Sequence, residues 1–88
     1  MRQFALAPSV MLPRDSIVGI FDLDTATVSK HTRDFLRRAQ ASGAVISVGE
    51  DLPQTFIVSS VFGGEDAERV YLSPQNSAGL AKKLLTNP

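Results

Sequence analysis

The fold depends on one stretch of nine residues, Ile17-Val18-Gly19-Ile20-Phe21-Asp22-Leu23-Asp24-Thr25. The β-branched residues and the nearly continuous apolar run from Ile17 to Phe21 predict a strand that is buried on both faces. Two carboxylates, Asp22 and Asp24, follow where this strand ends. Two hypotheses compete for them. Either they perform metal-assisted chemistry, or they cap the turn that leads into the next helix.

The residues after this stretch predict a helix. Ser29 is the expected N-cap, although Thr25 or Thr27 could begin the helix earlier. Apolar or small side chains recur at helical spacing and form one stripe, at Val28, Thr32, Phe35, Leu36 and Ala39. Gly43 stands where a left-handed C-terminal cap is expected.

The remaining elements are short. Strands are predicted at Phe4–Ala7, Val10–Leu12, Ala44–Val48, Thr55–Val61 and Arg69–Leu72, with a turn at 13–16, a loop at Phe62–Glu68 and a C-terminal helix at Ser77–Leu85. We therefore expect an α+β fold that forms a single small domain over residues 1–88. Its sheet is mixed or mostly antiparallel, with one main helix and a short C-terminal helix on one side.

Composition limits the classes of protein that are possible. The chain has 88 residues, of which 43% are hydrophobic and 20% charged, so it has room for one globular core. It has no cysteine, which excludes disulfides and thiolate metal sites. The apolar run near the N-terminus is too short for a signal peptide, and no run approaches the roughly 20 residues of a membrane span. We expect a cytoplasmic protein that does not enter membranes.

The carboxylate pair resembles the first motif of the haloacid-dehalogenase phosphatases, in which two aspartates surround Mg²⁺. That family normally has a glycine after the second aspartate, whereas here Thr25 and Ala26 follow Asp24. Only 64 residues remain after Asp24, too few for a parallel sheet whose βα units take about 30 residues each. We therefore expect Asp22, Asp24 and Thr25 to cap the strand-to-helix turn.

Other catalytic patterns are weak. His31 is the single histidine and has no obvious partner, and no lysine follows Gly63-Gly64 at phosphate-loop spacing. No serine lies in a nucleophile-elbow pattern. We therefore expect that the protein is not an enzyme. We also expect no catalytic or metal-ligating residue, no cofactor and no small-molecule substrate.

Positive charge gathers on the predicted helix. The whole chain has nine basic and nine acidic residues and a net charge of zero, which argues against binding nucleic acid by charge excess alone. Four basic residues nevertheless lie opposite the apolar stripe, namely Lys30, Arg33, Arg37 and Arg38. The cluster is either an ordinary solvated face or a surface that follows phosphates. Arg14 lies in the turn before Ile17, and its position in the sequence does not distinguish a structural role from a binding role.

Four segments carry a resemblance that covers residues 4–85: Ile17-Val18-Gly19-Ile20-Phe21-Asp22, then Thr32-Arg33-Asp34-Phe35-Leu36 ending at Gly43, then Pro53-Gln54-Thr55-Phe56-Ile57-Val58, and Val70-Tyr71-Leu72-Ser73-Pro74. In their order and spacing the chain resembles the bacterial extracellular-matrix regulatory proteins of the Rem family, and most closely the RemB-type branch. The resemblance implies a non-enzymatic α+β subunit that self-associates into a ring-like homo-oligomer. It also implies a DNA-binding transcription regulator that activates biofilm-matrix genes, with double-stranded DNA as the partner.

The resemblance has one departure. In the RemA-type branch, adjacent arginines just before the strong strand contribute to DNA binding, and the matching positions here are Asp51 and Leu52. If this chain binds DNA, the expected contacts are therefore Lys30, Arg33, Arg37 and Arg38, with Arg14. The alternative is a ring-forming protein-interaction module without DNA binding. Self-association is also expected because strands Thr55–Val61 and Arg69–Leu72 are predicted to have exposed edges that need covering.

Overall fold

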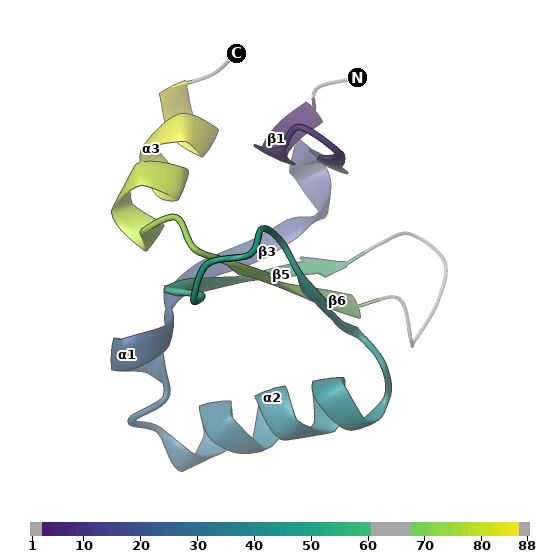
Figure 1. The fold of residues 1–88 in the computed structure, drawn as a ribbon, viewed down its shortest axis with the longest axis vertical. Coiled ribbons are helices and arrows are strands. Elements are labelled where there is room, and N and C mark those ends of the chain that lie inside the picture. The colour runs from purple at the N-terminus through teal and green to yellow at the C-terminus, as the bar shows by residue number, and fades with distance from the viewer. Residues whose placement is uncertain (1–2, 61–67, 87–88) are drawn as a thin grey trace.

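A four-stranded sheet with helices on both faces forms the centre of the molecule (Figure 1). The computed structural model describes residues 3–60 and 68–86. The strand order is β3-β5-β6-β4, with bounds β3 (Ile17–Asp22), β5 (Thr55–Ser60), β6 (Glu68–Ser73) and β4 (Val45–Ser47). β5 pairs antiparallel with both β3 and β6, whereas β4 pairs parallel with β6. The predicted α+β class, with a mixed and mostly antiparallel sheet, is confirmed.

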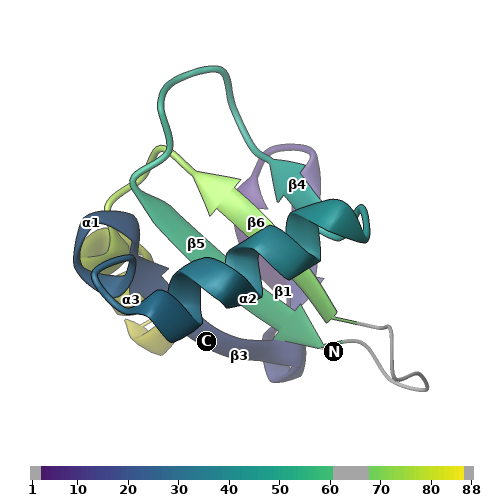
Figure 2. The same cartoon turned by 90° about the horizontal axis from the view of Figure 1, so that it is seen from below.

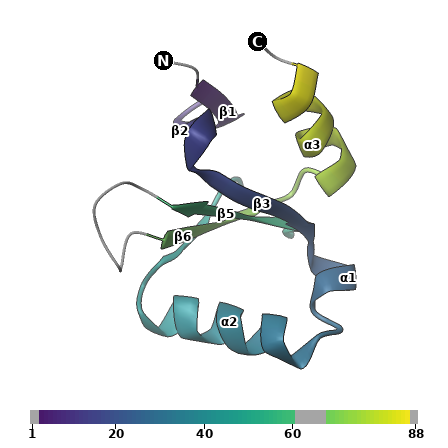
Figure 3. The same cartoon turned by 180° about the vertical axis from the view of Figure 1, so that it is seen from behind.

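The other elements cover the two faces of this sheet. They are the hairpin strands β1 (Gln3–Ala7) and β2 (Val10–Pro13), the 3₁₀ turn η1 (Arg14–Ser16), and the helices α1 (Leu23–Ala26), α2 (Lys30–Ala41) and α3 (Ser77–Thr86). The views from the front and from behind place α2 on one side of the sheet, and α3 with the hairpin on the other (Figures 1 and 3). The expectation that the helices share one side was wrong.

The sheet needs both covers because β5 is apolar on both faces. Phe56 and Val58 belong to a cluster with the helix residues Phe35, Leu36 and Ala39. Ile57, between them in sequence, belongs to a second cluster that includes Phe4 and Leu6 of β1 and Leu80 of α3. Since successive side chains of a strand point to opposite faces, a run of buried apolar residues requires a layer on each side.

β3 is an edge strand, which corrects two expectations. Its apolar run was expected to be buried on both faces, but Val18 is 63% exposed and Phe21 is 40% exposed. The register with β5 shifts between Ile17 and Gly19, which marks an irregularity of the β-bulge type. β5 and β6 were expected to have exposed edges, yet both are central strands paired on each side.

The ends of α2 follow the sequence. The Ser29 hydroxyl accepts a hydrogen bond from the Thr32 amide at 3.4 Å, and Gly43 has a φ of 77° just after the helix. Phe35, Leu36 and Ala39 pack on the sheet as expected. Val28 was wrongly included in the apolar stripe: it precedes the N-cap and is 79% exposed.

The predicted boundaries hold elsewhere to within one or two residues. The predicted C-terminal helix is α3, and Glu68, expected in a loop, begins β6. Val61, predicted as the end of a strand, and residues 62–67 of the predicted loop lie outside the described residues. Within the described part of the chain, no helix is long and apolar enough to cross a membrane.

Candidate nucleic-acid interface

The outer face of α2 carries the basic residues predicted from the sequence. Its inner face is fixed by Phe35, Leu36 and Ala39, which pack against the sheet. Lys30, Arg33 and Arg37 are exposed on the side of the helix that faces away from this contact. Arg38, which was expected opposite the apolar stripe, is exposed too, but it lies beside Phe35 and Ala39 at the edge of the contact. Figure 2 shows α2 lying across the sheet with its outer side unobstructed by any other described element. The structure therefore gathers four of the five predicted contact residues on one rigid helix.

Arg33 is held by the chain that precedes the helix. Its Nη1 atom donates hydrogen bonds to the carbonyl oxygens of Thr27 and Val28, at 2.7 and 2.9 Å. These contacts tie the connection between α1 and α2 to the first turns of α2. A guanidinium has five N–H donors, so the same side chain keeps donors for a further partner.

Arg37 is paired with an acid on its own helix. Its Nη1 atom lies 3.0 Å from Oδ1 of Asp34, at i,i+3 spacing. An exposed pair of this kind contributes only about 0–1 kcal/mol to stability. The carboxylate nevertheless lowers the positive potential around Arg37, so this residue alone attracts a phosphate weakly.

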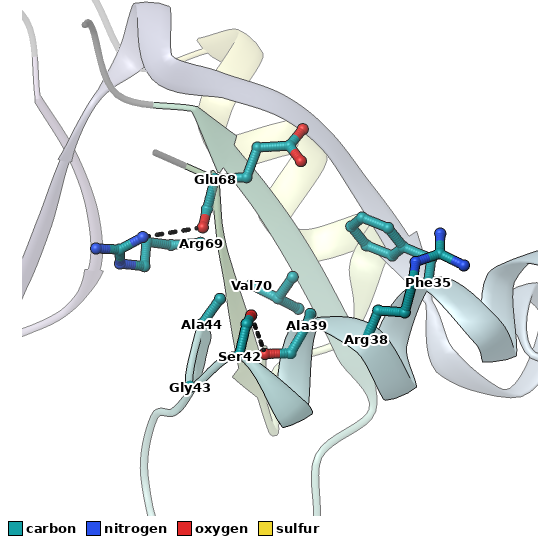
Figure 4. A pocket seen from close by; sticks show the side chains of 9 residues that line it. All are labelled: Phe35, Arg38, Ala39, Ser42, Gly43, Ala44, Glu68, Arg69 and Val70. Atoms are coloured by element: carbon teal, nitrogen blue, oxygen red, sulfur yellow. Dashed lines mark hydrogen bonds between the residues drawn. The ribbon is translucent and has the colours of Figure 1, made fainter. Parts of the chain in front are cut away.

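Lys30 and Arg38 are the unpaired charges of the helix. Within residues 3–60 and 68–86 neither makes a hydrogen bond or an ion pair, and both are exposed. Arg38 also borders a cavity of about 680 Å³ between the end of α2 and β6 (Figure 4). In that view Arg38 and Arg69 lie on opposite sides of the cavity, and Arg69 donates to the carbonyl oxygen of Glu68 at 3.1 Å.

This cavity is a poor anion site in spite of its two arginines. It lies at the C-terminal end of α2, beside Ser42 and Gly43. The carbonyl groups at this end carry the negative end of the helix dipole, which repels anions. The outer face of α2 is therefore the better phosphate surface.

Arg14 does not lie with the other four. It belongs to η1, in the connection from the β1–β2 hairpin to β3, and it is half-buried. Its Nη1 atom is buried without a hydrogen-bond partner. The predicted role of Arg14 in DNA contact stays a prediction, and it would require a surface separate from the outer face of α2.

The carboxylates after β3 have a structural role. Oδ1 of Asp22 accepts hydrogen bonds from the amide nitrogen and the hydroxyl of Thr25, at 3.0 and 3.3 Å, and so caps α1. The capping expected of Asp22 and Thr25 is confirmed. Asp24 lies exposed in the first turn of α1 and makes no such cap. Among the described residues, no three His, Asp or Glu side chains are grouped so that they could hold a metal ion.

The loop between β4 and β5 carries the departure from the Rem pattern. Asp51 and Leu52 are both exposed, and Leu52 is 88% exposed. An exposed acid at this place contributes no phosphate contact. A single exposed leucine is common on protein surfaces and by itself identifies no partner.

One surface was missed by the sequence analysis. Val18 and Phe21 border an apolar groove between β3 and α2, whereas they were interpreted as core residues. The available signal was Gly19, since a glycine inside a strand often marks a bulge or the close approach of another group. Here the ring of Phe21 lies over Gly19, where a Cβ atom would meet ring carbons at 2.5 Å.

Compared with models of known protein families, the chain matches none, and a search of curated proteins finds no match either.

Proposed function

We propose that this protein is a non-enzymatic, self-associating DNA-binding regulator that acts in the bacterial cytoplasm. The family resemblance adds the finer content of the proposal, which is activation of extracellular-matrix (biofilm) genes by a ring-like homo-oligomer. The observation that carries the proposal is the outer face of α2, where Lys30, Arg33 and Arg37 are exposed on a helix fixed to the sheet. Arg38 is exposed beside them, at the edge of the same helix.

A rigid helix with this pattern suits phosphate binding. Basic side chains at i, i+3 and i+7 lie in one column, and their docked helix does not have to be ordered when a ligand binds. Contacts of this type go to the DNA backbone and carry no direct sequence information. Sequence preference would then come from the shape and bending of the duplex along the assembly.

Self-association is a necessary part of the proposal. Arg33 is engaged by backbone carbonyls and Arg37 by Asp34, so one subunit offers a weak surface. The net charge of zero gives no long-range attraction to compensate. Several copies of the same face acting on one duplex would raise affinity through effective concentration.

A mobility-shift experiment at low salt tests the DNA contact. Lys30→Glu is expected to weaken binding by at least about tenfold, because a hydrogen bond to a charged group contributes about 1.5–3 kcal/mol and the new acid repels the phosphates. Lys82→Glu makes the same change of charge on α3, across the sheet from α2, and should leave binding within about twofold. Equal loss in both variants, or no shift of the wild type, would reject the proposal.

A second candidate function is an assembly module that does not contact DNA. Asp51 and Leu52, both exposed, favour it, because they replace the arginines implied by the RemA-type pattern. This candidate predicts that the wild type forms oligomers but shifts no duplex, even at low salt. Light scattering and the mobility shift, performed on one preparation, separate the two functions.

A further inference from the structure

One acid stands among the basic residues of α2. Asp34 is the single acidic residue of this helix, which also carries four basic residues. Side chains three and four residues apart are neighbours on a helix surface, so this acid lies beside Lys30, Arg37 and Arg38. Its position therefore brings a negative charge within reach of most of the phosphate surface proposed above.

The structure pairs this acid with Arg37. Oδ1 of Asp34 lies 3.0 Å from Nη1 of Arg37, and in the described part of the chain the carboxylate makes no other hydrogen bond or ion pair. The side chain of Asp34 is 34% exposed, whereas that of Arg37 is 75% exposed. Arg37 is therefore the more accessible partner, and a phosphate can approach it while the acid remains beside it.

Asp34 contributes little to the stability of the helix. It lies beyond the first turn, where an acid would interact favourably with the helix dipole. It is not the N-cap, since Ser29 has that role. Aspartate also has a low helix propensity, and an exposed ion pair adds little to stability. The main physical effect of Asp34 is therefore on the electrostatic potential of the helix surface.

The pair opposes phosphate binding in two ways. A phosphate that binds the Nη1 side of Arg37 must compete with the carboxylate for that donor, and one that binds another edge of the guanidinium still lies near a negative charge. The same charge also acts on Lys30. Side chains four residues apart have Cβ atoms about 5–6 Å apart, which is less than the roughly 8–10 Å over which salt screens charges.

Arg33 is not restrained in this way. Its Nη1 atom donates to the carbonyl oxygens of Thr27 and Val28, which are neutral acceptors. These contacts fix the position of the guanidinium but leave its full positive charge. Asp34, by contrast, opposes the charge of Arg37 directly.

We propose that Asp34 restrains the phosphate surface of α2 by holding Arg37, so that one copy binds DNA weakly and stable binding requires several copies. This inference rests on the DNA binding proposed above and names the residue that sets its strength. In each copy that meets the duplex, Arg37 exchanges its bond to the carboxylate for a bond to a phosphate. Because the restraint acts in every copy, it is offset only when several contacts act on one duplex.

Asp34→Asn tests the proposal, because it removes the negative charge at nearly constant side-chain size. In a mobility shift at low salt, it is expected to raise the affinity for a duplex at least about fivefold, since the release of an exposed pair is repeated in every bound copy. Asp15→Asn makes the same change of charge in η1, which leads from the β1–β2 hairpin to β3, and should stay within about twofold of the wild type. Circular dichroism checks that both variants keep the fold.

A double-mutant cycle separates the effect through Arg37 from a general effect of charge. In an Arg37→Gln chain the carboxylate has no arginine to hold, so adding Asp34→Asn should raise the affinity by no more than about twofold. A gain as large as in the wild-type background, or an Asp34→Asn chain that binds like the wild type, would overturn the restraint and leave DNA binding in place. If neither the wild type nor the Asp34→Asn chain shifts a duplex at low salt, the proposed function and this inference are both refuted.

Discussion

At the scale of residues, the basic side chains of α2 differ in ways that their sequence spacing does not reveal. All four are exposed, but Arg33 is fixed to the carbonyl groups of Thr27 and Val28, and Arg37 to Asp34. Lys30 and Arg38 have no such contact within the described residues. The i,i+3 spacing of Asp34 and Arg37 could have predicted their ion pair from the sequence. The contact of Arg33 depends on the path of the preceding turn, which no local pattern specifies.

Arg33 and Arg37 therefore have different effects on stability. Arg33→Ala is expected to lower the free energy of unfolding by about 1 kcal/mol, since two hydrogen bonds that fasten the α1–α2 connection are lost at an exposed site. Arg37→Ala, its matched control on the same helix, should cost no more than about 0.5 kcal/mol. Urea unfolding followed by circular dichroism compares the two. Equal costs would mean that the Arg33 contacts contribute nothing to the native state.

At the scale of elements, periodicity predicted the two longer helices and the strands, but it missed the short helix α1 and did not show which elements are neighbours. The spacing of Phe35, Leu36 and Ala39, with Ser29 and Gly43 at the ends, was sufficient to place α2. The apolar run of β3 was not sufficient to show that it is an edge strand, because a continuous run is also typical of a central strand. Sheet order is set by contacts distant in sequence, and these also decided that the helices cover both faces.

The turn after β3 gives a test at this scale. Asp22→Ala removes the side chain that caps α1 and is expected to destabilise the protein by about 1 kcal/mol. Asp24→Ala removes the neighbouring carboxylate, which makes no cap and only faces the helix dipole, and should cost about 0.5 kcal/mol or less. Thermal unfolding of the pair measures the difference. If Asp24→Ala were the more damaging change, the capping role assigned to Asp22 would be wrong.

At the scale of the whole molecule, the account depends on separation of charge rather than on net charge. The chain is neutral, but α2 concentrates basic residues on one side, and acids are found in the loop between β4 and β5 and after β3. Such a distribution suits a subunit whose copies contact each other through one pair of surfaces and a polyanion through another. The outer face of α2 is the surface that we propose for the polyanion.

The dependence of DNA affinity on salt tests this account most directly. For the assembled wild type, the logarithm of the binding constant should fall linearly with the logarithm of salt concentration, by about 0.9 for each phosphate contacted. Lys30→Gln removes one such contact from every copy that touches the duplex, so its slope should be shallower by about 0.9 per bound copy. A slope near zero for the wild type, or identical slopes for the two proteins, would contradict phosphate binding by α2.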